Sequence, residues 1–191
     1  MLTKTLALAV GLVLVAGGSY ARLQETLEIK PYMPASDSLK ARFSGVKTYF
    51  QRLAERMPEA DYDFRPTPVM ESFATRIAHT AGMNFEKCAY LVARPNPYQG
   101  VDLDATYTKK AELLTLLRES FTFCDGYMLR LSPAVLAETT QIKAPPGASF
   151  AEVKVELGGV AIDVVSHNME MYGYLAVYLR LKGIVPPTSG K

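Results

Sequence analysis

The sequence predicts an all-α fold, a four-helix bundle with antiparallel helices. Three observations carry this prediction. Apolar residues recur at helical steps of three and four in four separate segments, and clusters of proline and glycine divide these segments from one another. No segment shows a convincing alternation of apolar and polar residues, the pattern of a half-exposed strand. Such a set of amphipathic helices with short or irregular connections is typical of a bundle.

The N-terminus has the layout of a secretory signal peptide over residues 1–21, with Lys4 ahead of an apolar run and small residues at its end. Ser19 and Ala21 fit the minus-three and minus-one positions of a cleavage site, so we expect cleavage before Arg22. An uncleaved anchor helix is the alternative, but spanning a bilayer takes about 20 apolar residues and this run is shorter. We therefore expect a periplasmic or secreted protein that meets a membrane only through its signal peptide.

The charge of the chain is nearly balanced, with 21 Lys plus Arg against 19 Asp plus Glu. Nucleic-acid binding requires a concentrated positive charge, so we expect no nucleic-acid partner. After removal of the signal peptide about 170 residues remain (191 minus 21), which fit one domain with an adequate core. We expect this domain over residues 38–187, preceded by a proline-containing arm at 22–37 and followed by a tail at 188–191.

The first helix of the domain is expected to end at Pro58, because proline cannot continue a helix. Its apolar stripe consists of Leu39, Phe43, Val46, Phe50, Leu53 and Met57. A second helix is expected to begin at Thr67 and Pro68, a capping residue followed by a proline, and to run to about Val92. This helix is apolar on two neighbouring stripes, which predicts packing partners on both sides.

A third helix is expected from near Thr108, and Ser132 with Pro133 opens a short helical segment after it. The start of the fourth helix has two candidates. The capping box formed by Ser149 and Glu152 favours the earlier start, whereas a pair of glycines favours a start near residue 160. The later half of this helix presents one face with Val164, His167, Met171, Leu175 and Tyr178.

The two cysteines, Cys88 and Cys124, lie on apolar stripes of consecutive helices. Export places them where disulfides persist, so we expect a structural disulfide between them. Two buried thiols and a reactive pair are the alternatives. Cysteine–histidine catalysis has little support, because nine residues along a helix separate Cys88 from His79 by about 13 Å.

Three segments carry a resemblance to a known family: YDFRPTP at residues 62–68, HTAGMNFEKC at 79–88, and SHNMEMYGYLAVYLRLKGIVPP at 166–187. They resemble the DinB-like (DinB/YfiT) four-helix bundles. The resemblance implies a metal site with one histidine on the second helix and an H-x-x-x-H pair on the last. His79 and His167 match the first two ligands, but Met171 stands where the third histidine is expected. These are the two histidines of the chain, so it cannot form a three-histidine site.

The ligand types at this incomplete site limit the metals that it suits. A thioether such as that of Met171 favours soft ions, whereas zinc and nickel prefer imidazole or carboxylate. Asp163 lies one turn before His167 and is the candidate replacement donor, and Glu170 is a further oxygen donor. We therefore predict a degenerate site for a divalent metal, zinc or nickel, at His79, His167, Met171 and Asp163. A site without any metal and a site for an organic ligand remain as alternatives.

The resemblance implies a metal-dependent enzyme, either a hydrolase or a transferase that uses low-molecular-weight thiols. The missing histidine favours a competing hypothesis, a non-catalytic ligand-binding or structural module of the cell envelope that has lost its metal. The motifs HExxH and GxSxG, a phosphate loop and a dinucleotide fingerprint are missing from the sequence, which removes several other enzyme classes. The expected partners are a small molecule and, by analogy with the family, a second copy in a homodimer.

Overall fold

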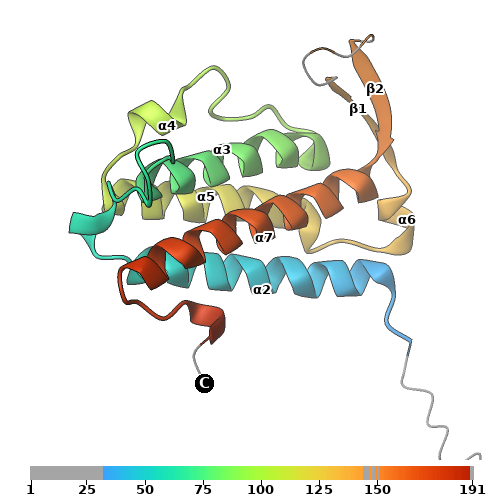
Figure 1. Ribbon diagram of the computed structural model, residues 1–191. Coiled ribbons are helices and arrows are strands. Elements are labelled where there is room, and N and C mark those ends of the chain that lie inside the picture. The colour runs from blue at the N-terminus through green and yellow to red at the C-terminus, as the bar shows by residue number, and fades with distance from the viewer. Residues whose placement is uncertain (1–31, 144–146, 148, 150, 190–191) are drawn as a thin grey trace, which may run out of the picture. The chain divides into compact units, whose positions relative to one another are not determined.

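The computed structural model describes residues 32–143, 147, 149 and 151–189. The expected signal peptide at 1–21 and most of the expected arm lie outside these residues, as do the last two residues of the expected tail. From Pro34 onward the chain forms one compact unit, a bundle of helices (Figure 1). Among the residues that the structure describes, no helix is both long and apolar enough to cross a bilayer.

Four long helices build the bundle: α2 (Ala35–Arg56), α3 (Phe73–Val92), α5 (Lys110–Met128) and α7 (Leu157–Leu181). The shorter elements are the helical turns η1 (Glu59–Asp61), α4 (Leu103–Thr106), α6 (Pro133–Leu136) and η2 (Pro187–Ser189). Two strands, β1 (Thr139–Lys143) and β2 (Glu152–Glu156), form a hairpin. The predicted all-α fold class is confirmed, with one small hairpin added to it.

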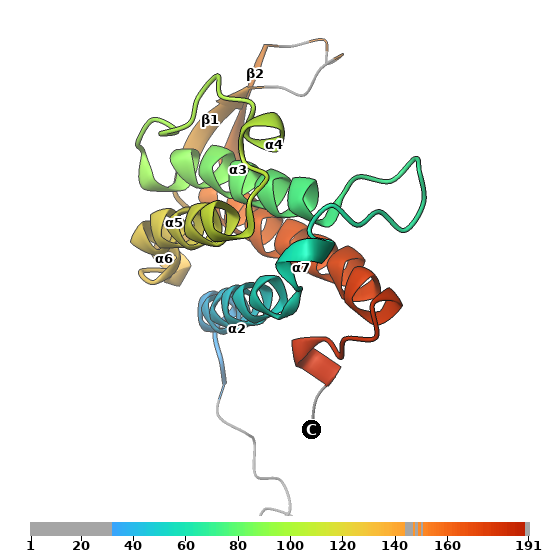
Figure 2. The ribbon, with the colours of Figure 1, turned by 90° about the vertical axis from the view of Figure 1, so that its left-hand side faces the viewer.

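The long helices are arranged so that α3 packs against α5 and α7, while α2 packs against the same two helices from the other side (Figure 2). Helices α3 and α5 run in the same direction. Asn84 bonds to Ser120 and Cys88 to Cys124, and both pairs are separated by 36 residues. A parallel pair needs a long connection, which is the crossover from residue 93 to residue 109 that contains α4.

Helices α3 and α7 run in opposite directions. Arg76, near the start of α3, contacts Met171, whereas Lys87, near its end, pairs with Asp163. The bundle therefore combines antiparallel and parallel neighbours. Helical periodicity shows which face of a helix is buried but not which neighbour covers it, so the parallel pairing of α3 and α5 was not evident from the sequence.

Helix α3 begins at Phe73 rather than at the predicted Pro68. Ser72 is the capping residue, and its Oγ accepts a hydrogen bond from Thr75 N at 3.1 Å. The chain before it folds back, because Phe73 N donates to Phe64 O at 3.0 Å. Local capping preferences suited both positions, and this long-range contact decided between them. The predicted end at Val92 is confirmed.

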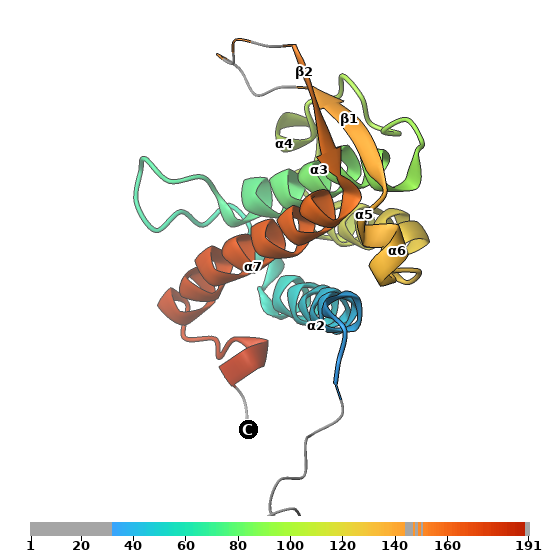
Figure 3. The same cartoon turned by 90° about the vertical axis from the view of Figure 1, so that its right-hand side faces the viewer.

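The hairpin is the element that the sequence interpretation missed. Its strands pair antiparallel from Thr139 opposite Glu156 to Lys143 opposite Glu152, and each strand alternates exposed with half-buried residues (Figure 3). The predicted capping box at Ser149 and Glu152 is wrong, since Glu152 begins a strand. Helix α7 begins at Leu157, close to the later of the two predicted starts. The segment EVKVE at residues 152–156 alternates valine with charged residues, which is the pattern of a half-buried strand, so the prediction that no segment alternates convincingly is wrong here.

Gly158 allows the start of α7 to approach the preceding helical turn closely. A Cβ atom at this position would lie 2.9 Å from Leu136 O in α6. Such a distance is shorter than a non-bonded contact, so the backbone would have to move. Gly158, one of the two glycines that left the start of the fourth helix undecided, therefore lies in the first turn of α7 and permits its close packing against α6.

Candidate functional site

The candidate site lies between α3 and α7, where His79 and His167 face each other. The ring centroids lie 5.5 Å apart and the ring planes meet at 52°. Both side chains are half-buried. The apolar stripe of α7 directs His167 inward, and α3, which is covered on two sides, brings His79 to meet it. Two imidazoles at this separation are close enough to contact one ion or one small ligand.

The surroundings of His167 favour its neutral imidazole form. Burial lowers its pKa, and electrostatic interaction with Lys87 and His79 lowers it further, while Glu170 and Asp163 act in the opposite direction. Its Nδ1 atom is buried and has no hydrogen-bond partner among the described residues. A buried polar atom without a partner is uncommon in a folded protein and is typical of a binding position. When it carries no proton, Nδ1 of His167 can accept a hydrogen bond from a ligand or coordinate an ion through its lone pair.

The position of the expected third histidine is filled by Met171, with Arg76 beside it. Met171 is buried, and Arg76 Nη1 lies 3.8 Å from its Sδ. Arg76 Nε lies 2.9 Å from Glu71 Oε2, but its N–H is not aligned with that oxygen, so the contact is an ion pair rather than a hydrogen bond. The guanidinium also lies 5.2 Å from the centre of the Tyr174 ring. A permanent positive charge thus lies one helical turn before His79.

Asp163, the predicted oxygen donor, pairs with Lys87 rather than with a histidine. Its side chain is 56% exposed and its carboxylate forms an ion pair with Lys87. Glu170 is exposed as well. In the part of the chain that the structure describes, no group of three His, Cys, Asp or Glu side chains is arranged to hold a metal. Two imidazoles and a thioether beside a guanidinium do not fit a catalytic zinc or nickel site, which needs three strong ligands.

A small open cavity of about 280 Å³ borders His79 on the side of the crossover segment. Asp102 and Asp104 line it, together with Glu86 of α3. Burial raises the pKa of the Asp104 carboxyl, while electrostatic interaction with the nearby His79 acts in the opposite direction. His79 therefore contacts the His167 ring on α7 and also borders this cavity, whose volume is close to the lower end of the range for small-molecule sites.

The sequence interpretation missed three charged residues of this site: Arg76, Lys87 and Asp104. The first could have been found, because a residue three positions before His79 shares its helical face. Asp104 belongs to the crossover and reaches His79 only through tertiary packing. Lys87 is placed by the antiparallel register of α3 and α7, which pairs it with Asp163.

The cysteines lie on the other side of α3. Cys88 and Cys124 form a disulfide that joins α3 to α5, with the Cα atoms 5.2 Å apart, and both are fully buried. The predicted disulfide is therefore confirmed. It contributes to the frame of the bundle and is not part of the histidine site.

Comparison with known proteins agrees with this arrangement. The family model described as DinB superfamily matches residues 42–170, about two thirds of the 191 residues. The matched range contains both histidines and ends one residue before Met171. No curated protein sequence matches the chain. The chain belongs to the DinB superfamily, which includes metal-dependent enzymes.

Proposed function

We propose that this chain is an exported DinB-like protein whose histidine site has lost its catalytic metal, and that it acts as a non-catalytic ligand-binding module of the cell envelope. The observation that carries the proposal is the Arg76 guanidinium, 3.8 Å from the Sδ atom of Met171. In the DinB-like pattern, residue 171 is the third metal ligand. Here that ligand is a buried thioether, and a positive charge lies against it.

Electrostatics supports this proposal. Two unit charges 4 Å apart interact by roughly 4 kcal/mol at an effective dielectric constant of 20, and a divalent ion doubles that repulsion. The ion pair with Glu71 and contact with solvent reduce the effect, since the Arg76 side chain is 23% exposed. The guanidinium nevertheless opposes a divalent cation at the place where the family needs a third ligand.

The polar groups at the interface of α3 and α7 suit a small polar molecule. His167 Nδ1 has no partner among the described residues, and the Arg76 guanidinium offers N–H donors and a positive charge. A ligand with a hydrogen-bond donor for the imidazole and an acidic or carbonyl oxygen for the guanidinium would satisfy both. The His79 ring lies 5.5 Å from the His167 ring and is a further contact for such a ligand.

A metal-dependent hydrolase or thiol transferase is the second candidate function. The separation of the two imidazoles favours it, because His79 and His167 are placed to share one ion, and the unpaired Nδ1 of His167 is a chemically suitable donor. Such an ion would have two strong protein ligands in place of three. Measurement of metal affinity therefore distinguishes the two candidate functions, because the enzyme requires a tightly bound ion and the binding module does not.

The metal test uses titration calorimetry with zinc and nickel on metal-stripped protein, after measurement of the metal content of the purified protein. We expect no tight site in the wild type and a modest gain in Met171→His. The double variant Met171→His/Arg76→Gln should bind about tenfold to hundredfold more tightly than Met171→His alone, because the third imidazole is added and the opposing charge removed.

The matched control is Met171→His/Arg180→Gln, which removes the charge of an exposed arginine on α7 and should behave like Met171→His alone. Tight stoichiometric metal binding by the wild type that is lost in His79→Ala and in His167→Ala would overturn the proposal in favour of the enzyme. The export part of the proposal has a separate test: protein recovered from the cell envelope or the medium should begin at Arg22 when its N-terminus is sequenced.

A further inference from the structure

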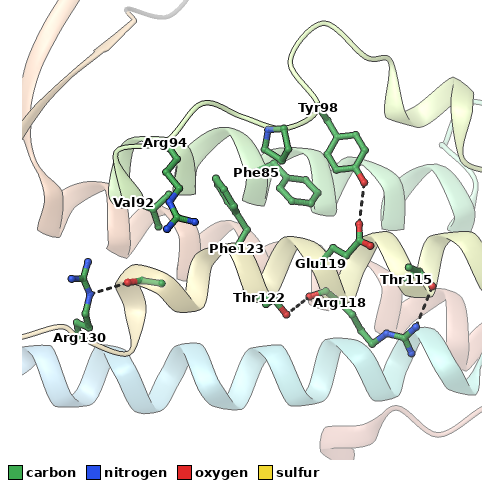
Figure 4. A pocket seen from close by; sticks show the side chains of 12 residues that line it. Phe85, Val92, Arg94, Tyr98, Thr115, Arg118, Glu119, Thr122, Phe123 and Arg130 are labelled. Atoms are coloured by element: carbon green, nitrogen blue, oxygen red, sulfur yellow. Dashed lines mark hydrogen bonds between the residues drawn. The ribbon is translucent and has the colours of Figure 1, made fainter.

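A second site is formed on the opposite side of α3, where a long groove runs between α3 and α5 under the start of the crossover. The groove is open to solvent and has a volume of about 1110 Å³, slightly above the usual range for small-molecule sites. Figure 4 shows its aromatic rings in the centre of the view and its arginine side chains around them. Neither histidine lines it, so it is separate from the histidine pair between α3 and α7.

The floor of the groove is aromatic. The Phe85 ring centroid lies 5.7 Å from that of Phe123 and 4.8 Å from that of Tyr98. Phe85 is buried, whereas Phe123 and Tyr98 are partly exposed and present ring surface to the groove. The disulfide joins α3 and α5 three residues after Phe85 and one residue after Phe123, so the spacing of the two helices is covalently held at this point. The rings thus form a preorganised apolar surface.

Three arginines surround this floor: Arg94 at the start of the crossover, Arg118 on α5 and Arg130 just after α5. Within the described residues, none of the three guanidinium groups lies within 4.0 Å of a carboxylate. The acidic residue of the groove is Glu119, which accepts a hydrogen bond from Tyr98 Oη at 3.0 Å. Three positive charges against one negative leave the groove with a net charge of +2.

Arg118, on α5, and Arg130, just after it, each donate one hydrogen bond within the protein. Arg118 Nη2 donates to Thr115 Oγ1 at 3.1 Å, and Arg130 Nε donates to Gly126 O at 2.9 Å. A guanidinium has five N–H donors, so each keeps donors for a ligand. The third, Arg94, follows Ala93, whose left-handed backbone (φ 51°) turns the chain at the end of α3. Its side chain lines the groove together with Phe123 (Figure 4).

We propose that this groove binds an organic anion with a planar aromatic body, such as an aryl carboxylate or sulfonate. The ring system of the ligand packs on the aromatic floor, and the guanidinium groups bind its acidic group through paired, charge-assisted hydrogen bonds. Twelve residues separate Arg118 from Arg130, which corresponds to about 18 Å along a helix, so one small ligand does not reach both equally. Arg94, which lines the groove at the start of the crossover, is the main anchor in this proposal, and Arg118 and Arg130 contribute less.

The test uses the fluorescence of 8-anilinonaphthalene-1-sulfonate, a planar aromatic sulfonate, in titrations of the folded, disulfide-bonded protein. We expect saturable binding to one site that weakens as salt is added. Arg94→Ala should weaken it about tenfold, and Arg118→Ala or Arg130→Ala about twofold to fivefold. The matched control is Arg180→Ala, which removes an exposed arginine with one hydrogen bond to a hydroxyl, as Arg118 has, and should bind like the wild type.

Two further measurements distinguish the proposed site from general apolar binding. Glu119→Gln keeps an acceptor for Tyr98 but removes the negative charge of the groove, so it should tighten binding about twofold to fivefold. By calorimetry, 2-naphthoate should bind and 2-naphthylmethylammonium should not, although both carry the same ring system. Equal binding of the two ligands, or affinity unchanged in all three arginine variants with native circular dichroism, would overturn the proposal.

Discussion

The two faces of α3 differ in what holds them to their neighbours. Toward α5, the disulfide between Cys88 and Cys124 and a largely apolar surface join the helices, with one buried hydrogen bond from Asn84 to Ser120. Toward α7, the contacts near the ends of the interface are charged, and between them His79 faces His167. The side of α3 that faces α5 thus stabilises the fold. The side that faces α7 has polar groups where apolar side chains would stabilise the protein more.

The distribution of unpaired polar atoms makes the difference clear. In the described residues, three buried side-chain atoms lack a hydrogen-bond partner: Arg76 Nε, His167 Nδ1 and Asn168 Oδ1. All three belong to residues on α3 or α7 at the interface between these helices. Buried polar groups without partners reduce stability, so their concentration at one interface indicates a place kept for a ligand. Four tests of this comparison follow, from the largest expected effect to the smallest.

Removal of the disulfide should give the largest loss of stability. Cys88→Ala/Cys124→Ala should lower the free energy of unfolding by about 2 to 4 kcal/mol, because the unfolded chain regains the freedom of a 36-residue loop. Urea denaturation of the wild type and of the double variant measures this difference in the free energy of unfolding. A loss below about 1 kcal/mol would mean that apolar packing alone holds α3 to α5. Alkylation of unreduced, denatured wild type should label no thiol.

Asn84 forms hydrogen bonds to both neighbouring helices, α5 and α7. Substitution of its partner Asn168 should give the next largest loss of stability. Asn168 Nδ2 donates to Asn84 Oδ1 at 2.6 Å, and Asn84 Nδ2 donates to Ser120 Oγ at 3.2 Å, all three residues being buried. Asn168→Leu leaves Asn84 Oδ1 without a donor and should cost about 1 to 3 kcal/mol in urea denaturation.

The double variant Asn84→Leu/Asn168→Leu is the control, because it removes both members of the pair. It should cost less than the sum of the two single changes, since no buried oxygen is left unpaired. Strict additivity in this cycle would show that the two side chains do not interact.

His167→Phe should have the opposite sign. This change removes the unpaired Nδ1 and keeps a ring of similar shape, so we expect the free energy of unfolding to rise by about 0.5 to 1 kcal/mol. Thermal and urea denaturation of metal-free protein check this. A marked loss of stability would contradict our interpretation that the α7 face keeps its polar groups for a ligand.

The smallest effect is expected at the end of α3. Ala93 adopts a left-handed backbone with φ of 51°, which is strained for a residue with a Cβ atom. Ala93→Gly should stabilise the protein by about 0.5 kcal/mol, the relief of strain less the greater freedom of glycine in the unfolded chain. Ala89→Gly, in the regular part of α3, is the matched control and should destabilise by about 1 kcal/mol.

Much of the site could be predicted from helical faces. The stripe that contains Val164 and Leu175 directs His167 inward, and the structure has it there. The meeting of His79 with His167 also follows from helices packed side by side. The direction of Asp163 could not be predicted, because its position at the edge of a helical face allows either orientation. Its pairing with Lys87 depends on the register of another helix.

The sequence by itself determined the number of long helices, the ends of those that stop at proline or glycine, the cysteine pair and the incompleteness of the histidine site. These properties depend on residue identity and on local periodicity. The tertiary structure alone decided that α3 and α5 run parallel and that Arg76 takes the place beside Met171. Periodicity marks a face for burial, but the partner of that face is chosen by contacts between residues far apart in the chain.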